Sequence, residues 1–404
     1  MNKIKKTTIW IINHYAIPPR EAGGTRHFDI ANELVRKFGC EVYIIASKFN
    51  HLSKKYIINK KGIVIENING VNFVWIDTIA YKKNNWKRVV NIVQFTYKVL
   101  FFQKKIKVKK PDIIIGSTVH PFAALASGFL AKKNKCDFVF EIRDLWPQTF
   151  IDMRLWTTNS WKSRIFRQIE KKTVEKSQKL IVLSPLTSPY LKKNYNIDDN
   201  RILYLPNSVV LDNFSNTIYQ KKRKNKISII YVGGIDVVHG LETLFEAAKD
   251  INDEYKNKIE IHIVGDGKKR NDYINLTKNI SIIKWHKPVA KFKVPEILKS
   301  ADVLFLSTGK VLYGSENKLA EYLAAGRPLL VSTEGDHNNP INEIECGISV
   351  KPNDVNALVK AIIAFYNIDN EILKQYAENS RKLAENRFSI KKNTKKLVRF
   401  LNSN

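Results

Sequence analysis

The segment 315–328, with the sequence SENKLAEYLAAGRP, combines a predicted helix start with acidic and basic side chains. It lies between two apolar runs, 301–307 and 328–332, so a strand, a polar loop, a helix and a second strand are predicted in that order. Ser315 is the predicted N-cap, and free backbone N–H groups at such a helix start can hold a phosphate. Glu321 follows about one and a half turns later and could reach a sugar hydroxyl. The ordinary alternative is an αβ unit that binds nothing at this point, and the segment alone does not decide between them.

Glycine-rich loops adjoin predicted strands in both halves of the chain. Gly23 and Gly24 precede a predicted helix at 25–38, and Gly234 and Gly265 follow predicted strands in the second half. Glycine allows the backbone to approach a ligand closely and leaves its amides free to bind an anion. An ordinary glycine turn is the alternative, and the three-glycine spacing of a dinucleotide site is absent from the sequence.

Polar residues follow two predicted strands of the first half. His120 comes after the strand at 112–117, and Arg143 and Asp144 come after the strand at 138–142. Open α/β sheets bind ligands at the carboxyl ends of their parallel strands, so these side chains are candidates for a site. A lone histidine at a strand end is nevertheless more often structural than catalytic.

The elements that would position these residues alternate as strands and helices along the chain. At 404 residues the chain is too long for one ordinary core, and two domains of about 200 residues are predicted. The segment 209–226 is polar and basic without a clear period, so the interdomain linker is predicted there. A second set of strands and helices begins after it, and a basic amphipathic helix is predicted at 391–401.

Composition indicates a folded protein of the cytoplasm. Hydrophobic residues make up 44% of the chain, which excludes a disordered polypeptide. Cys40, Cys136 and Cys346 are far apart and show no paired metal spacing, which favours a reducing compartment. The apolar run at 7–12 is too short for a secretory signal, and no run approaches the ~20 residues that cross a bilayer.

The net charge of +30 indicates attraction to polyanions, although coding bias toward lysine could produce part of it. No zinc-finger, RNP-like or helix-turn-helix signature favours nucleic acid, so a membrane surface is the preferred partner. The predicted helix at 86–110 mixes aromatic and aliphatic residues with clustered lysines, as an interfacial helix does. A helix that faces the core and has a solvated basic end is an equally good interpretation.

The order of these features resembles the GT-B glycosyltransferases, and among them the retaining glycosyltransferase family 4. The resemblance covers nearly the whole chain and rests on six short motifs: the glycine pair at 23–24, LPNS at 205–208 with Asp212 and Phe214, and the segments 233–240, 265–267, 301–303 and 317–328. The element RDLWP at 143–147, together with Ser315 and Lys318, is most similar to the branch that builds bacterial O-antigen and capsule repeats. That branch includes N-acetylfucosamine transferases.

The resemblance implies an α/β fold of the GT-B type, with two Rossmann-like domains facing across a cleft. Residues 1–206 would form the N-terminal acceptor-binding domain, and residues 207–384 the C-terminal nucleotide-sugar-binding domain. A helix at 385–404 would return to the N-terminal domain.

By the same resemblance, Glu321 matches the glutamate that contacts the ribose hydroxyls of the nucleotide. The first glutamate of that paired motif is replaced by Tyr313. The arginine and lysine that neutralise the donor diphosphate in the family fall at Gly234 and His239, so another cation must replace them. Lys318 is the predicted substitute, because it precedes Glu321 by about one helical turn. A solvated helix lysine is the alternative.

The donor-binding residues expected from the motifs are Gly23, Gly24, Gly234, His239, Gly265, Ser315, Asn317, Lys318 and Glu321. His120 is expected to contact the donor sugar and Asp144 to orient the acceptor, with Arg143 as a third catalytic candidate. The family is metal-independent, so helix N-termini and cations would stabilise the departing diphosphate without a metal or cofactor. A front-side mechanism, in which the leaving phosphate helps to deprotonate the acceptor, is the usual proposal for such retaining enzymes.

We therefore predict a glycosyltransferase that moves a hexosyl or N-acetylhexosaminyl group from a UDP-linked donor to a polyprenyl-diphosphate-linked or saccharide acceptor. It would act in bacterial O-antigen or capsule synthesis, as a peripheral protein on the cytoplasmic face of the inner membrane, with no specific nucleic-acid partner. One alternative is a nucleotide-sugar 2-epimerase of the same architecture. Another is a nonenzymatic basic protein that binds lipid or RNA.

Overall fold

The computed structural model describes residues 7–21, 23–82, 85–214, 219, 225–308, 313, 315–333 and 339–403. The chain divides into two compact units. The first comprises Met1–Pro206 and Asn393–Asn404, and the second comprises Asn207–Lys392. Residues 385–392, which we expected to group with the C-terminal helix, thus belong to the second unit. The predicted linker at 209–226 also begins inside the second unit, where the backbone of Val209 pairs with that of Phe388 and Ile390.

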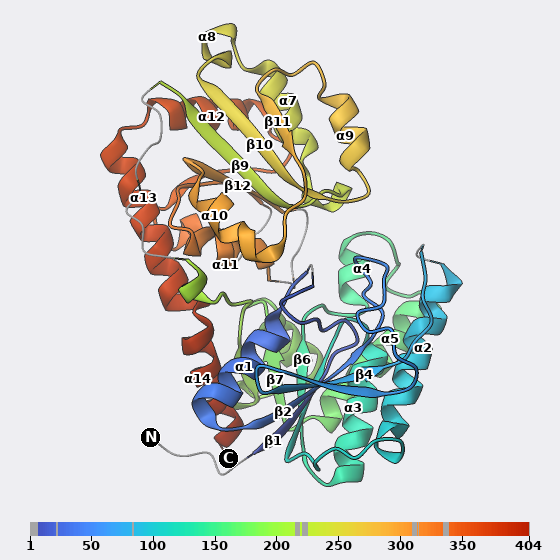
Figure 1. The fold of residues 1–404 in the computed structure, drawn as a ribbon. Helices are drawn as coiled ribbons and strands as arrows, with labels where there is room; N and C mark the ends of the chain where they lie inside the picture. Colours follow the sequence, from blue (N-terminus) through green and yellow to red (C-terminus); the bar gives the residue numbers. More distant parts are fainter. Residues whose placement is uncertain are drawn as a thin grey trace. The chain divides into compact units, whose positions relative to one another are not determined.

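The first unit contains, among its described residues, an eight-stranded sheet in the order β3-β4-β2-β1-β5-β6-β7-β8 (Figure 1). All neighbouring strands run parallel except β3 and β4. The strands are β1 (Thr8–Ile12), β2 (Glu41–Ser47), β3 (Val64–Ile68), β4 (Val71–Ile76), β5 (Ile113–Ser117), β6 (Asp137–Ile142), β7 (Lys179–Val182) and β8 (Ile202–Tyr204). Strand β1 is buried along its whole length because helices cover both faces of such a sheet, which explains its continuous apolar run.

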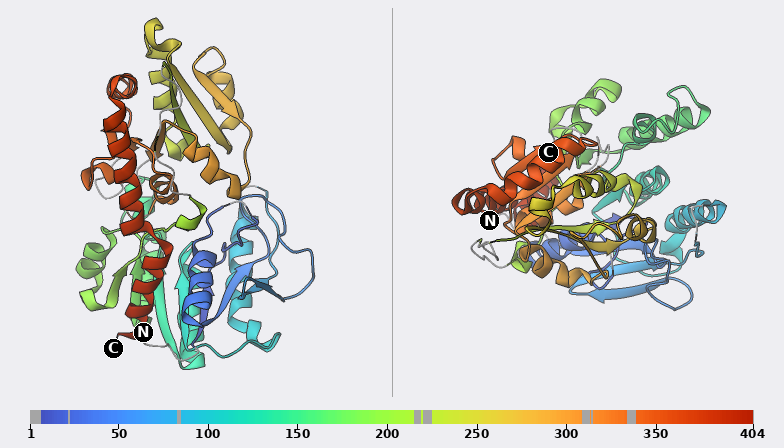
Figure 2. Two further views of the ribbon diagram at one scale, coloured as in Figure 1. Left: turned by 60° about the vertical axis from the view of Figure 1, so that its left-hand side comes forward. Right: turned by 90° about the horizontal axis from the view of Figure 1, so that it is seen from above.

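The helices of the first unit connect these strands. They are α1 (Arg26–Phe38), α2 (Trp86–Phe101), α3 (Pro121–Asn134), α4 (Gln148–Asp152), α5 (Trp161–Lys176) and α6 (Thr187–Tyr195). Helix α2 ends nine residues before the predicted end at Lys110. The last helix, α14 (Ile390–Asn402), lies beside the first sheet (Figure 2). There the Lys179 ammonium donates to the carbonyl oxygens of Phe400 and Leu401.

The second unit contains, among its described residues, a six-stranded parallel sheet in the order β11-β10-β9-β12-β13-β14. The strands are β9 (Ile227–Gly234), β10 (Ile259–Asp266), β11 (Ile283–His286), β12 (Val303–Thr308), β13 (Leu329–Thr333) and β14 (Gly347–Val350). The helices are α7 (Glu242–Asp250), α8 (Asp253–Lys256), α9 (Arg270–Leu276), α10 (Val294–Lys299), α11 (Asn317–Ala324), α12 (Val355–Asn367) and α13 (Asn370–Leu383). None of the helices described in either unit is long and apolar enough to cross a membrane.

Alternate residues of β9 enter two separate cores. Ile229 and Tyr231 pack with residues of α7 and α12, whereas Ile230 and Val232 pack with residues of α10 and α11. This division follows from the two-residue period of a strand, which sends successive side chains to opposite faces of the sheet. The carboxyl end of β9 therefore lies between two layers of helices.

Candidate active site

Lys318, in the first turn of α11, meets two side chains from the carboxyl end of β9 and the turn that follows it. Its Nζ lies 3.1 Å from the hydroxyl of Tyr231 and 3.3 Å from Nδ1 of His239. The same ammonium lies 4.9 Å from the centre of the Tyr231 ring, a cation–π contact. The structure thus brings together two predicted donor-binding residues, Lys318 and His239. It also adds Tyr231, which the sequence patterns did not single out.

Burial shifts the pKa values of both basic groups. It lowers the pKa of Lys318 to about 8, partly offset by the Glu316 carboxylate. It also lowers the pKa of His239 to about 4, to which the Lys318 charge adds. Near pH 7 the lysine is therefore protonated and the histidine neutral. A neutral His239 that accepts from Lys318 at Nδ1 carries its own proton on Nε2, so the pair offers two N–H donors of the kind that bind anions.

The glycines of this region make room for neighbouring atoms. A Cβ at Gly233 would lie 2.8 Å from Cδ of Lys318, and a Cβ at Gly234 would lie 2.8 Å from Nε2 of His239. At Gly265 a Cβ would lie 1.9 Å from the carbonyl oxygen of Gly233 on the paired strand, and φ is +152°. Gly265 is therefore required by the close packing of β9 and β10, whereas Gly233 and Gly234 leave space for two basic side chains that could move.

We expect Gly265→Ala to destabilise the second unit by about 2–5 kcal/mol, because the added Cβ meets backbone and the positive φ is strained. Gly234→Ala is the matched control, and we expect it to change stability by less than about 1 kcal/mol because its Cβ meets only the movable end of the His239 side chain. Thermal unfolding of both variants tests this difference. Equal melting temperatures would contradict it.

Ser315 does not cap α11, contrary to the prediction. The N-cap is Glu316, which makes no side-chain capping bond. The Ser315 hydroxyl instead accepts from the backbone N–H of Asn207 at 3.1 Å, and its carbonyl oxygen accepts from the Asn207 amide at 2.6 Å. These two hydrogen bonds tie Ser315 to Asn207, the first residue of the second unit, so its hydroxyl is not used as a helix cap. The side chain of Asn317 lies outside the described part of the structure.

Glu321 forms an ion pair with Lys291, which belongs to a short 3-10 turn just before α10. Its carboxylate is partly exposed, so it is also accessible to a ligand. That Glu321 contacts ribose hydroxyls therefore stays a prediction. Lys291 is a partner that sequence spacing did not indicate.

His120 is buried at the start of α3 in the first unit, with both ring nitrogens in contact with protein groups. Its Nδ1 accepts weakly from the backbone N–H of Ala123 at 3.4 Å, and its Nε2 lies 2.8 Å from Nδ1 of His14. Burial lowers the pKa of His120 to about 3, so the imidazole is neutral. His14 in turn stacks on Phe95 at 4.2 Å. His120 therefore caps a helix, and its contact with a donor sugar stays a prediction.

The other candidates of the first unit are Arg143 and Asp144, which follow β6, and the glycine pair Gly23 and Gly24, which precedes α1. The backbone N–H of Arg143 donates to the Thr118 hydroxyl at 2.8 Å, which holds the ends of β5 and β6 together. Asp144 is exposed next to it. Gly23, with φ of +135°, and Gly24 directly precede Thr25, the N-cap of α1.

A buried ion network that the sequence patterns missed lies beside these residues. The Glu141 carboxylate accepts from Nε of Arg26 at 2.9 Å and lies 2.7 Å from Nε2 of His27. The Arg26 guanidinium also donates to the carbonyl oxygens of Leu205 and Pro206. Although burial alone would raise it, the pKa of Glu141 is held well below its usual value by Arg26 and His27. The sequence did contain one sign of this network, namely a glutamate inside the otherwise apolar strand FVFEI, because a buried charge of this kind needs a partner to balance it.

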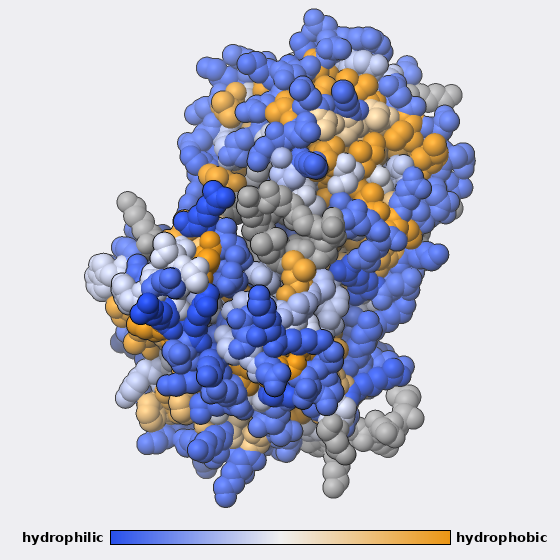
Figure 3. Space-filling view, turned by 180° about the vertical axis from the view of Figure 1, so that it is seen from behind, coloured by the Kyte–Doolittle hydropathy of each residue, from blue (hydrophilic) through white to orange (hydrophobic). Residues whose placement is uncertain are grey.

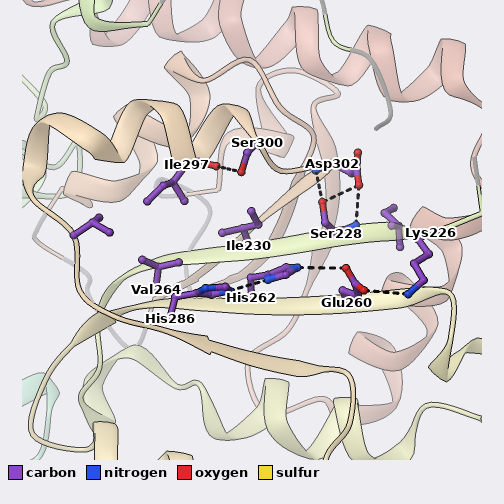
Figure 4. Close-up of a pocket in the computed structure, with 12 residues that line it drawn as sticks. Lys226, Ser228, Ile230, Glu260, His262, Val264, His286, Ile297, Ser300 and Asp302 are labelled. Atoms are coloured by element: carbon purple, nitrogen blue, oxygen red, sulfur yellow. Dashed lines mark hydrogen bonds and ion pairs between the residues drawn. The ribbon is translucent and has the colours of Figure 1, made fainter. Parts of the chain in front are cut away.

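A pocket of about 400 Å³ opens on the second unit, along the strands β9, β10 and β11 (Figure 4). Its polar side chains pair with one another: Lys226 with Glu260 at 3.1 Å, and His262 with His286 at 2.9 Å. It shares no residue with the predicted donor-binding set, although Val264 in its wall directly precedes Gly265. Within the described parts of the chain, no three His, Cys, Asp or Glu side chains are grouped as a metal site requires.

Curated relatives resemble part of this chain. The UDP-Gal:alpha-D-GlcNAc-diphosphoundecaprenol alpha-1,3-galactosyltransferase of Escherichia coli is 25% identical over 250 residues, which are 58% of this chain and 62% of that enzyme. The chain spans about three fifths of the length of the curated relatives it matches.

Two solved structures have a similar fold over 98% of this chain. Sucrose-phosphate synthase from Thermosynechococcus elongatus has a TM-score of 0.75 at 16% identity, with 98% of that chain covered. WaaG, a glycosyltransferase involved in lipopolysaccharide biosynthesis, has a TM-score of 0.71 at 16% identity, with 100% of that chain covered. At this identity the likeness shows the fold, which is that of two-domain glycosyltransferases with parallel sheets.

Family models match both halves of the chain. The description "Glycosyltransferase Family 4" matches residues 23–213, and "Glycosyl transferases group 1" matches residues 226–367. The two models meet near the boundary between the two units. Both halves of the chain therefore match glycosyltransferase models, the first half that of family 4 and the second half that of group 1.

Proposed function

We propose that this protein transfers a sugar from a UDP-linked donor to a polyprenyl-diphosphate-linked acceptor, with retention of the anomeric configuration. The observation that carries the proposal is the cluster of Lys318, His239 and Tyr231 beside Gly233 and Gly234 at the carboxyl end of β9. The N–H donors of Lys318 and His239 suit a diphosphate, and the Tyr231 hydroxyl, which donates to the carbonyl oxygen of Gly234, helps to position Lys318. The E. coli relative supports the chemistry, since its name gives a UDP-sugar donor and a diphosphoundecaprenol acceptor.

In this proposal Lys318 and the start of α11 bind the donor diphosphate and stabilise the charge that grows on it as the anomeric C–O bond breaks. The acceptor hydroxyl attacks the anomeric carbon from the same face, and its proton passes to the departing phosphate. Glu321 accepts hydrogen bonds from the ribose hydroxyls. Asp144 orients the acceptor and His120 contacts the sugar, with Arg143 beside them.

The proposal also places the enzyme in the synthesis of a bacterial surface polysaccharide such as O-antigen or capsule. It would work on the cytoplasmic face of the inner membrane, where a polyprenyl-linked acceptor is embedded. The net charge of +30 supports this location, because the cytoplasmic leaflet is negatively charged. No metal ion is required in this scheme, because the protein's own cations offset the diphosphate charge.

The test is transfer of labelled sugar from UDP-galactose, UDP-glucose and UDP-N-acetylhexosamines to GlcNAc-diphosphoundecaprenol and to a short-chain analogue. We expect one donor to give a product with retained configuration, and EDTA to change the rate less than about twofold, since no step uses a metal. Loss of activity with EDTA that Mg²⁺ or Mn²⁺ restores would contradict the metal-free part.

Two controls sharpen this experiment. Glu321→Ala should raise the KM for the donor about tenfold or more, because a charge-assisted hydrogen bond contributes about 1.5–3 kcal/mol. Equal KM values would show that Glu321 does not bind the ribose.

Two other outcomes would identify a different function. Product formed from the UDP-sugar alone would identify an epimerase. Salt-dependent lipid or RNA binding without affinity for any nucleotide would identify a nonenzymatic binding protein.

A further inference from the structure

Helix α2 carries a stripe of large apolar side chains that face solvent. Trp86, Val89, Val93 and Tyr97 are each 58–65% exposed, and Phe101 continues the stripe at the end of the helix. The spacing of three or four residues puts all five on one face of the helix. Large apolar side chains scattered singly on a surface need no explanation, but a continuous stripe of them does.

The opposite face of α2 holds the helix on the first unit. Asn91, Phe95 and Val99 on that face are buried, and the Asn91 amide donates to the carbonyl oxygen of Ile79. This buried face, rather than the stripe, holds α2 on the first unit. Because more than half of Trp86, Val93 and Tyr97 is exposed, the stripe presents a surface that another molecule can contact.

Neighbouring helices extend the apolar surface. Helix α3 packs against both α2 and α5, and the three lie together at one flank of the first unit (Figure 1). Phe129 on α3 and Trp161 and Ile165 on α5 are 48%, 68% and 48% exposed. Figure 3 shows this flank at the left edge of the first unit, where orange and pale side chains are interleaved with deep blue ones. We call this surface, formed by α2, α3 and α5, the aromatic flank.

Positive charge surrounds the stripe. Residues 78–111 contain ten lysines and arginines and no aspartate or glutamate. Lys87 and Lys104 lie over the rings of Trp86 and Phe101, at 5.7 Å and 5.5 Å from the ring centres. A partner must therefore accept aromatic and aliphatic side chains at its surface and present negative charge around them.

We propose that the aromatic flank docks this protein on an anionic lipid bilayer, with α2 lying in the plane of the membrane interface. Tryptophan and tyrosine rings settle at the boundary between headgroups and acyl chains, and lysines beside them extend toward the anionic headgroups. Nucleic acid satisfies the charge but not the apolar stripe. The benefit of docking rests on the proposed function, since docking would bring the first unit to a membrane-embedded acceptor. The evidence for the surface itself is the exposure and the charge of its side chains.

The test is flotation of the full chain with phosphatidylglycerol vesicles and with phosphatidylcholine vesicles. We expect the protein to float with the anionic vesicles only. The triple variant Trp86→Ser, Val93→Ser, Tyr97→Ser should lower the bound fraction at least about tenfold, because the apolar anchor is lost and only charge remains. Phe292→Ser, at a position 78% exposed on the second unit, is the matched control and should bind like the unmodified protein. All four substituted positions are exposed, so the variants should keep the melting temperature.

The outcomes separate docking from catalysis. Equal flotation of the triple variant and the unmodified protein, or no flotation with anionic vesicles, overturns the docking inference. If the triple variant keeps transfer to a soluble short-chain acceptor but loses transfer to an acceptor in vesicles, the inference is supported. Flotation that depends on the aromatic flank, in a protein that transfers sugar to neither acceptor, supports docking and overturns the proposed function.

Discussion

Replacing Lys318 with methionine is expected to lower kcat/KM for sugar transfer by about 100- to 1,000-fold, the loss typical when one group that stabilises developing charge is removed. Lys318 is the cation that meets His239 and Tyr231 beside Gly233 and Gly234, where the proposed diphosphate binds. Methionine preserves most of the apolar stem that packs against Gly233, so the change removes charge with little change in shape. The measurement is steady-state transfer over a range of donor concentrations.

The same residue sets the expected pH dependence. The protonated lysine is the active form, and burial lowers its pKa to about 8 in the free protein. We therefore expect kcat/KM to be level between about pH 6 and 7, to be halved near pH 8, and to approach a tenfold fall per unit above about pH 9, since kcat/KM reports the free enzyme. Lys318→Arg should lack this decline, because arginine stays protonated.

The control is Lys293→Met, which removes an exposed lysine from the same unit and should leave transfer unchanged. The melting temperature of Lys318→Met should equal or exceed that of the unmodified protein, because a partly desolvated charge is removed. A Lys318→Met protein with normal kcat/KM would show that the cation of the diphosphate site lies elsewhere.

Glu141→Ala is expected to destabilise the first unit by about 3–5 kcal/mol, because it leaves the buried guanidinium of Arg26 without its counter-ion. For a unit of this size the melting temperature should fall by roughly 10 °C. Glu141→Gln should be less damaging, since the amide oxygen still accepts from Arg26. Calorimetry can follow the transition of the first unit.

Glu175→Ala is the matched control for this effect. Glu175 pairs with Lys171 on the exposed face of α5, where both side chains are more than half exposed. Exposed pairs of this kind contribute about 0.3–0.5 kcal/mol, so the melting temperature should hardly change. If Glu141→Ala were as stable as Glu175→Ala, the Arg26–Glu141 pair would not be a structural element of the first unit.

Much of the fold could be predicted because its signals are local. The apolar run of β1 and the alternation of strands and helices indicated two α/β halves, and the fold is confirmed. The predicted end of α2 at Lys110 was wrong, because the helix ends at Phe101. Lysines and aliphatic residues continue beyond that point, so the sequence pattern does not mark the end. The prediction that Ser315 caps α11 was also wrong. Local patterns could not show that its hydroxyl bonds to Asn207, which is 108 residues away in the sequence.

The candidate site was predicted where its residues follow strands or start a helix, and missed where they pair over long sequence distances. Lys318 and His239 were singled out from motif positions, and the structure brings them together. Arg26 and Glu141 are 115 residues apart, and only folding shows that a helix start and a strand end meet. The roles of Asp144 and His120 remain predictions, because they concern ligands rather than neighbouring residues.

The position of Lys318 has a consequence for how such sites are recognised. In the family that the chain resembles, the diphosphate cations project from the loop after the first strand of the second half, at the positions of Gly234 and His239. Here the ammonium reaches the same loop from α11, 84 residues beyond Gly234 in the chain, and lies 3.3 Å from His239. In the proposed site a cation from α11 thus takes the place of the loop cations, at a different position in the sequence but beside the same loop. A search for the loop residues alone would miss a site built in this way.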